Sequence, residues 1–336
     1  MKKILTTTLA LALLTVAAAC TPAAAATVTR TAMSPYQWTG VTISQKGRTF
    51  VNFPTWNDHP DYGVGEVIDG VSRPYPGVQA NKQFICVQSI VTDDQDHLWI
   101  LDAAKLRGKD VDPGGAKLYR VDLGSNEIDK VYTLKAPAIL PNSYLNDVRI
   151  DTQRKFAYMT DSSAGGILVL NLSTGKAWRA LTGIQEVAAE SQTPYQKARH
   201  IKPAASDGIE LSKDGNTLYF TSLGGRHLYA INTASLRAPD QTMEERQKAI
   251  ETLSTTLPGA DGLCLQGHTL YMANLPENSL YAFDLETKQG RTIDTPPVRW
   301  ADTLAAAPDG TLYFTTSQLN YDKKDRIPYG LYKLAE

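Results

Sequence analysis

The chain has few histidines, few cysteines and no excess of either charge. Its 336 residues include 34 Lys and Arg against 35 Asp and Glu, so the formal net charge is −1. Nucleic-acid binding is therefore not expected, because phosphate contacts need clustered Lys and Arg that this balance does not supply. The five histidines never fall at zinc-like spacings, and no G-x-S-x-G elbow, P-loop or dinucleotide fingerprint is present. No enzyme class is identified by a short motif.

Cysteine is scarce as well. Apart from Cys20 near the N-terminus, only Cys86 and Cys264 are present. Two cysteines do not provide a disulfide framework for a protein of this size. Both lie in apolar, strand-like runs, so we expect buried free thiols, and nothing beside them indicates an activated nucleophile.

The N-terminal segment predicts export. A charged start at Lys2 and Lys3 precedes an apolar run from Ile4 to Ala19, which ends in small residues before Cys20. This pattern is typical of a secretory signal and is too short and wrongly flanked for a membrane-spanning helix. We expect residues 1–26 to comprise a signal peptide and a short linker.

Two fates of this signal are consistent with the sequence. The residues before Cys20 resemble a bacterial lipobox, although Ala17 stands where that pattern prefers Leu. Lipid attachment at Cys20 would give a periplasmic or outer-membrane-anchored lipoprotein, and the anchor would then be the protein's contact with a membrane. Cleavage near Ala26 would instead give a secreted protein without a lipid, and a retained helix is a third alternative.

Residues 27–336 repeat a single pattern. Each unit has a strand entrance, an alternating strand, a turn and a second strand with aromatic residues. A third short strand follows each unit, and six units of about 50 residues each are typical of four-stranded propeller blades. We expect an all-β fold, a six-bladed β-propeller that forms one domain over residues 27–336. The six stretches begin "GVTISQKGRTFVNFP", "QSIVTDDQDHLWILD", "NDVRIDTQRKFAYMTD", "SDGIELSKDGNTLYFTS", "ADGLCLQGHTLYMAN" and "ADTLAAAPDGTLYFTT".

The last unit lacks a fourth strand, and the segment near residues 27–36 is a candidate to supply it. Such an N-terminal strand would close the ring and cover a sheet edge that could otherwise recruit another chain. Two segments break the repeat: Gly183–Ala205, and Leu236–Leu257, where Thr242 and Glu245 form a capping box ahead of a short helix. We expect both to be loops on a propeller face, used for recognition or present as surface decoration.

Polar residues stand where the first strands of successive units begin, and those entrances converge on one mouth of a propeller channel. Crowded carboxylates repel one another, which raises some of their pKa values unless a cation or hydrogen-bond donors compensate. Gly208 and Gly262 are expected to let the backbone turn tightly beneath them. The entrance residues are Asn146, Asp147, Asp207, Asp261 and Asp302.

These residues have two competing interpretations. Oxygen ligands suit Ca²⁺, so Asn146, Asp207 and Asp261 are candidate metal ligands. The same residue types at a strand entrance also accept backbone N–H bonds in Asx-turns, which is a purely structural role. With the aromatic side chains of Trp300 and Tyr195, the mouth would suit a small organic ligand such as an amine or a catechol-like ring.

Several stretches resemble, in order, the yellow and major royal jelly protein family. They are "GRTFVNFPTW", "PYPG", "VQSIVTDDQDHLWILD", "YLNDVRID", "AYMTDSSAGGILVLNLSTGKAWR" and "DGIELSKDGNTLYFTSL". The resemblance implies a secreted six-bladed propeller, with members described as dopachrome-converting enzymes and others as binders of biogenic amines or sterols. It implies no agreed catalytic set. A bacterial member would be described as dopachrome tautomerase-related, which is an analogy.

A more distant resemblance is to propellers of the gluconolactonase and senescence-marker type, which hold a divalent cation in the channel. Asn146 and Asp261 match entrance positions that carry ligands there, whereas Asp207 stands where that family more often has Asn. The first unit offers Trp38 and Thr39 where an acidic ligand is expected.

The sequence thus favours an exported propeller that binds a small organic molecule. As an enzyme it would be a tautomerase-like isomerase, because moving a proton needs only a carboxylate of raised pKa near the substrate. The first alternative is a Ca²⁺-dependent lactonase or esterase, in which the cation polarises the carbonyl and activates water. The second is a non-catalytic envelope scaffold that binds a protein partner.

Overall fold

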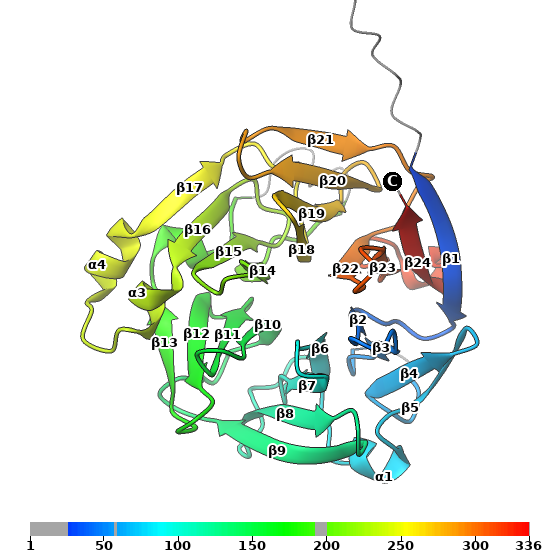
Figure 1. Cartoon of the computed structure of the whole chain (residues 1–336), viewed down its shortest axis with the longest axis horizontal. Helices are drawn as coiled ribbons and strands as arrows, with labels where there is room; N and C mark the ends of the chain where they lie inside the picture. Colours follow the sequence, from blue (N-terminus) through cyan, green and yellow to red (C-terminus); the bar gives the residue numbers. More distant parts are fainter. Residues whose placement is uncertain (1–25, 57–58, 192–199, 336) are drawn as a thin grey trace, which may run out of the picture.

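Six four-stranded antiparallel sheets surround a central axis as blades (Figure 1). The computed structural model describes residues 26–56, 59–191 and 200–335, so the predicted signal peptide with Cys20 and the predicted ligand residue Tyr195 lie outside the described residues. The predicted all-β, six-bladed propeller is confirmed. Within the described ranges, no helix is long and apolar enough to cross a membrane.

In blades one to five the strands run outward from the axis in chain order, and in blade six β1 follows β24 as the outermost strand. Blade one contains β2 (Val41–Ile43), β3 (Thr49–Asn52), β4 (Val64–Ile68) and β5 (Val71–Pro74). Blade two contains β6 (Val87–Thr92), β7 (His97–Asp102), β8 (Ala116–Asp122) and β9 (Glu127–Leu134). Blade three contains β10 (Leu145–Asp151), β11 (Phe156–Asp161), β12 (Gly166–Asn171) and β13 (Ala177–Leu181).

The second half repeats this plan. Blade four contains β14 (Ser206–Leu211), β15 (Thr217–Ser222), β16 (Leu228–Asn232) and β17 (Ile250–Ser254). Blade five contains β18 (Leu263–Gln266), β19 (Thr269–Asn274), β20 (Ser279–Asp284) and β21 (Gly290–Ile293). Blade six contains β22 (Ala301–Ala306), β23 (Leu312–Thr316), β24 (Tyr329–Ala335) and β1 (Thr27–Ser34). The short helices are α1 (Val78–Asn81), η1 (Gln185–Val187), α3 (Thr233–Arg237), α4 (Met243–Lys248) and η2 (Lys323–Asp325).

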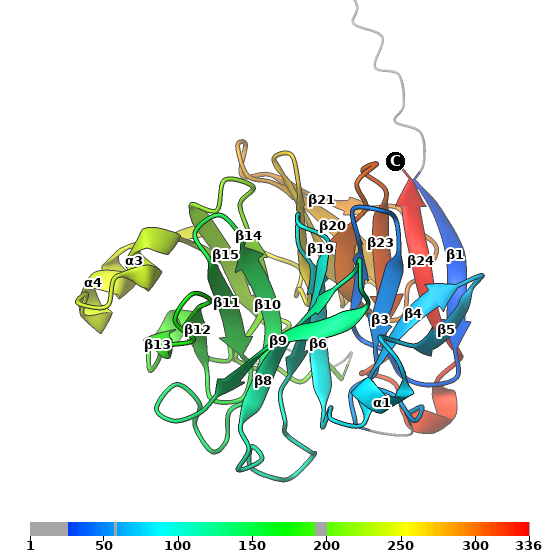
Figure 2. The same ribbon diagram turned by 60° about the horizontal axis from the view of Figure 1, so that its bottom comes forward.

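The outer position of blade six is filled by β1. It pairs antiparallel with β24, from Thr27 opposite Ala335 to Ser34 opposite Tyr329, and the two strands lie side by side in both views (Figures 1 and 2). Trp38, fully buried just after β1, donates its Nε1–H to the carbonyl oxygen of Gly330 at 3.2 Å. The edge of β24 is thereby covered and the ring is continuous.

The core lies between neighbouring blades. Each first strand contributes one aliphatic side chain that is at most 3% exposed, and each such burial stabilises the fold by about 1.5–3 kcal/mol. The alternating strand pattern in the sequence places these side chains on the packed face. They are Val41, Ile90, Val148, Ile209, Leu263 and Leu304.

The segment Leu236–Leu257 differs from its prediction. Its capping box is present, since Thr242 Oγ1 accepts from Glu245 N at 3.2 Å and Glu245 Oε2 accepts from Thr242 N at 2.7 Å. However, α3 and α4 lie at the outer rim and pack against β13, and the segment continues into β17 (Figure 1). Leu236 and Met243 join the apolar cluster between blades three and four, so this segment is part of the core packing and not a loop on a propeller face.

Candidate functional site

The first strands of blades two, three, four and six have a register shift at their entrances. Such β-bulges bend a strand and re-aim its side chains, often next to functional sites. The bulges lie at the same point of the repeated pattern, two residues before the buried aliphatic side chain. We call the six equivalent positions the mouth layer: Thr39, Gln88, Asn146, Asp207, Asp261 and Asp302.

Side chains of the mouth layer form a hydrogen-bonded chain across four blades. Gln88 Nε2 donates to Asn146 Oδ1 at 3.3 Å, and Asn146 Nδ2 donates to Asp207 Oδ2 at 2.7 Å. Asp207 is hydrogen-bonded to Asp261, and Trp300 Nε1 donates to Asp261 Oδ2 at 2.6 Å. The fold therefore brings the predicted residues Asn146, Asp207, Asp261 and Trp300 together.

Burial controls the ionisation of the carboxyls in the mouth layer. Asp207, Asp261 and Asp302 are only 4%, 6% and 7% exposed, and burial raises the pKa of all three carboxyls well above their ordinary value. The negative charge of neighbouring carboxylates raises the pKa further. Burial and the mutual repulsion of the two carboxylates therefore favour the protonated form of the Asp207–Asp261 pair.

Asp147, which was also predicted as a ligand residue, does not join this hydrogen-bonded chain. Its Oδ1 accepts from Ser89 Oγ at 2.6 Å and from Arg149 NH1 at 2.9 Å. The bulge in β10 turns Asp147 away from its neighbour Asn146, so Asp147 acts as the counter-ion of a buried arginine.

The two glycines beneath the mouth have a different role from the predicted tight turn. Neither Gly208 nor Gly262 has a positive φ. A Cβ atom on Gly208 would collide with the carbonyl oxygen of Asp261, and one on Gly262 with that of Asp302. Glycine is required there because the backbone of the next blade approaches closely.

The entrance carboxylates could have had a structural role as acceptors of backbone N–H bonds. In this structure, residues at the ends of the second strands accept such bonds. Asn52 Oδ1 accepts from Gly40 N at 2.9 Å, Asp102 Oδ1 from Cys86 N at 2.8 Å, and Asp161 Oδ1 from Tyr144 N at 2.9 Å. These side chains hold the entrances of the first strands. The mouth-layer carboxyls Asp207 and Asp261 bond mainly to other side chains.

A pocket of about 530 Å³ lies over the mouth layer, and we call it the entrance pocket. Its aromatic lining consists of Trp56, Tyr144 and Trp300. Tyr144 Oη accepts from Trp56 Nε1 at 2.6 Å and donates to Gln88 Oε1 at 2.7 Å. The hydrogen-bonded chain of the mouth thus continues into the pocket wall.

Ser162 provides a second connection, because it lines the pocket and its Oγ accepts from Asn146 Nδ2 at 3.1 Å. Of the predicted site residues, Trp300 lines the pocket directly, while Asn146, Asp207 and Asp261 form the layer linked to its wall. The predicted segment Gly183–Ala205 contributes His200 and Lys202 to the lining. Trp56, Tyr144 and Gln88 were not predicted, because none of them is a carboxylate at a strand entrance.

Backbone strain is concentrated around the entrance pocket. His200 and Trp300 line it with φ of 56° and 57°, and Ala104 and Gln318 adopt φ of 49° and 52° beside the lining residues Lys105 and Leu319. The other positive-φ residues that are not glycine are Asp, Asn or Lys in hairpin turns. Non-glycine residues in this conformation cost about 1–3 kcal/mol each and cluster at ligand-binding sites.

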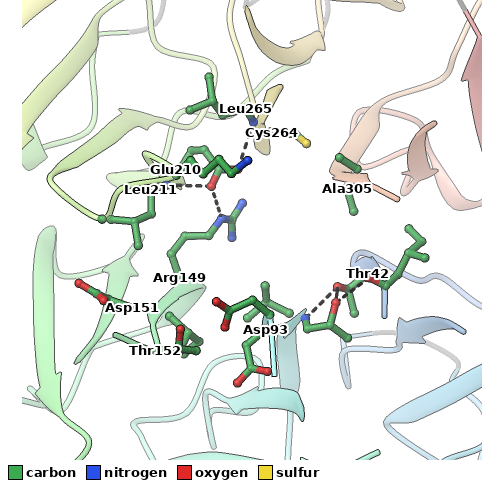
Figure 3. Close-up of a pocket in the computed structure, with 18 of the residues that line it drawn as sticks. Thr42, Asp93, Arg149, Asp151, Thr152, Glu210, Leu211, Cys264, Leu265 and Ala305 are labelled. Carbon is green, nitrogen blue, oxygen red and sulfur yellow. Dashed lines mark hydrogen bonds and ion pairs between the residues drawn. The ribbon is translucent and has the colours of Figure 1, made fainter. Parts of the chain in front are cut away.

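A second pocket of about 470 Å³ lies where the first strands end, and we call it the turn-side pocket (Figure 3). One residue per blade faces it from the third position after the mouth layer: Thr42, Val91, Arg149, Glu210, Cys264 and Ala305. Arg149 donates to Glu210 Oε1 at 3.1 Å, to Asp147 Oδ1 at 2.9 Å and to the carbonyl oxygen of Leu263 at 2.9 Å. Arg149 and Glu210 thus bond to each other across two blades, and the two pockets share no lining residue.

The predicted thiols are buried and free, as expected. Burial raises the pKa of both Cys86 and Cys264, so neither is an activated nucleophile.

The mouth layer as arranged does not fit a Ca²⁺ ion. Ca²⁺ takes six to eight oxygen ligands. Asn146 turns its Nδ2 toward Asp207, and the carboxyls of Asp207 and Asp261 bond to each other. In the part of the chain that the structure describes, no group of three or more His, Cys, Asp or Glu side chains is placed to hold a metal.

Comparison with known proteins gives a family and a fold. The family model for the major royal jelly proteins matches residues 85–287. No curated protein matches the chain at a significant level.

Many solved structures share the architecture. A gluconolactonase from Xanthomonas campestris aligns with TM-score 0.59 and 14% identity over 92% of this chain and 89% of its own. The calcium-binding protein regucalcin from Agrobacterium tumefaciens aligns with TM-score 0.56 and 15% identity, over 90% of each chain. Virginiamycin B lyase from Staphylococcus aureus aligns with TM-score 0.53 and 14% identity, over 93% of this chain and 99% of its own. Identities this low show the fold alone.

The raised carboxyl pKa values predict how stability depends on pH. A buried carboxyl whose folded-state pKa is raised above its ordinary value of 3.8 favours the native state at low pH, and this contribution is lost as pH rises toward the folded-state pKa. The melting temperature of the wild type is therefore expected to fall between about pH 5 and about pH 8. Asp261→Asn should weaken that fall and melt at least ~2 °C higher at the upper pH.

The substitution is conservative, because an amide can donate to Asp207 and accept from Trp300 as the protonated carboxyl does. Asp94→Asn, which alters an exposed carboxylate at the turn-side pocket, is the matched control and should leave the pH dependence unchanged. Equal pH slopes for wild type and Asp261→Asn, measured by scanning calorimetry, would contradict the assignment of a buried protonated pair.

Proposed function

Because the chain belongs to the major royal jelly protein family, we propose that it is a small-molecule-binding propeller whose entrance pocket holds an aromatic ligand of the catechol type. The observation that carries this proposal is the pocket itself. Its volume of about 530 Å³ lies within the range of small-molecule sites, which combine aromatic walls with a few placed polar groups.

The lining supports a hydroxylated ring as ligand. Trp56 is partly exposed and offers a ring for stacking, which is worth about 0.5–1.5 kcal/mol beyond the area it buries, whereas Trp300 lines the pocket but is only 3% exposed. The hydroxyls of Tyr144 and Ser162 sit in the wall and belong to the hydrogen-bonded chain of the mouth. A pair of ring hydroxyls could exchange hydrogen bonds with these groups, because a hydroxyl both donates and accepts.

An aromatic amine could stack on the same rings. However, the carboxyls that were predicted to attract its ammonium group favour an amine less than the lining favours a hydroxylated ring. Asp207, Asp261 and Asp302 lie below the pocket lining, and burial raises the pKa of each. A protonated carboxyl offers no negative charge to an ammonium group.

The enzymatic form of the proposal is a tautomerase-like isomerisation of a quinone-type ring. Such a reaction removes a proton from carbon and delivers one to a carbonyl oxygen, so it needs a base and an acid of matched pKa. The Asp207–Asp261 pair holds an acid and a base side by side, and Trp300 links it to the pocket wall. We propose this pair as the proton reservoir of the site.

Removing one hydroxyl tests the binding proposal. Tyr144→Phe should weaken binding of 4-methylcatechol by roughly 2–10-fold, because it deletes a hydroxyl that donates to Gln88 and accepts from Trp56. Binding is measured by isothermal titration on the folded protein, with the melting temperature as a check of integrity. Tyr313→Phe, which removes a hydroxyl on β23 away from the pocket, is the control. Wild-type affinity in Tyr144→Phe would refute the placement of the ligand.

A Ca²⁺-dependent lactonase or esterase is the rival proposal, supported by the shared fold with a gluconolactonase and with the calcium-binding regucalcin. A specific ion that binds only the folded state raises the melting temperature as its concentration rises. We expect chelator and millimolar CaCl₂ to leave the melting temperature within about 1 °C of each other. A saturable rise with CaCl₂ that Asp261→Asn abolishes would favour the lactonase instead.

We also propose that the chain is exported and lipid-anchored at Cys20. In a bacterial host, the wild type should incorporate an alkyne-tagged fatty acid, and Cys20→Ser should lose the label, because the thiol is the attachment point. Unlabelled wild type with a mature N-terminus near Ala26 would establish simple cleavage instead.

A further inference from the structure

The two pockets on the axis carry opposite charge. The entrance pocket is lined by Lys105, Arg107, Lys202 and Arg326, and by no Asp or Glu. The turn-side pocket is lined by five carboxylates against two cations: Asp93, Asp94, Asp151, Glu210 and Asp214 face Arg149 and Lys213. A chain whose net charge is only −1 thus gathers positive charge at the pocket with the aromatic lining.

The cations of the entrance pocket come from separate loops. Lys105 and Arg107 follow β7, Lys202 precedes β14, and Arg326 lies between η2 and β24. Lys105 Nζ donates to the carbonyl oxygen of Asn142 at 2.6 Å, and Arg326 Nε to that of Tyr321 at 3.0 Å. Within the described ranges, none of the four forms an ion pair with a carboxylate, so their charge is available to a ligand.

The layer beneath does not cancel this charge. The mouth-layer carboxyls Asp207 and Asp261 are at most 6% exposed and burial raises the pKa of both, so they present little negative charge to the pocket. A concave site lined by one sign of charge concentrates ligands of the opposite sign.

We infer that the ligand of the entrance pocket carries an acidic group, which makes it an aromatic acid rather than an aromatic amine. The inference rests on the proposed function and adds the sign of charge that the site selects. The ring stacks on Trp56, and the acidic group lies toward the four cations of the pocket, which we call the rim: Lys105, Arg107, Lys202 and Arg326. Arg326 is held in place by its bond to Tyr321, and a guanidinium can bind a carboxylate through two parallel hydrogen bonds.

Three probes with the same ring and different charge test the inference: 3,4-dihydroxyphenylacetate, 4-methylcatechol and dopamine. Titration calorimetry of the folded wild type is expected to give an affinity for the acid about 10-fold above that for the neutral catechol, with dopamine the weakest. The advantage of the acid should shrink as the ionic strength is raised from about 0.05 M to about 0.5 M, because salt screens partly exposed charges.

Substituting cations of the rim tests whether they cause the preference for the acidic probe. The double variant Arg107→Gln/Lys202→Gln changes two exposed cations for which the structure shows no carboxylate partner, so it should fold normally. It is expected to lose most of the advantage of the acid while binding 4-methylcatechol as the wild type does. Lys213→Gln at the turn-side pocket is the matched control and should keep the full preference.

The outcomes separate the two proposals. Equal affinities for the acid and the neutral catechol, or a preference for dopamine, would overturn the inference and leave the catechol pocket standing. An unchanged preference in the double variant would overturn the assignment of the rim. Absence of binding by all three probes would overturn the proposed function together with the inference.

Discussion

Pairing of β1 with β24 is the interaction on which the rest of the structure depends. It joins residues from the two ends of the described chain and makes six separate sheets into a closed ring. Closure gives the six strand entrances a common axis, so that Asn146 and Asp207, 61 residues apart, lie within hydrogen-bond distance. The chemistry of the mouth is therefore a property of the circular arrangement and of no single blade.

Crowding three carboxyls at one mouth creates a charge problem that a protein can solve with a cation or with protons. Here the side chains of Asp207 and Asp261 are directed at each other, and burial raises the pKa of both carboxyls. The fold shared with the calcium-binding protein regucalcin does not by itself fix the chemistry of this mouth.

The repeated strand pattern predicted the blades and the gathering of Asn146, Asp207 and Asp261, because strand periodicity and ring geometry are local and regular. The direction of Asp147 could not be predicted, since it depends on a bulge that changes the alternation of side chains. The residues of the pocket wall could not be predicted for a different reason. Trp56 and the cations of the rim lie in loops of unrelated sequence, and only the folded ring brings them together.

The partly buried Arg149 belongs to the turn-side pocket alone. Its guanidinium bonds to Asp147, Glu210 and the carbonyl oxygen of Leu263, and the two pockets have no wall residue in common. The two pockets are therefore lined by separate sets of residues. A molecule held against the aromatic lining of the entrance pocket touches none of the carboxylates that line the turn-side pocket.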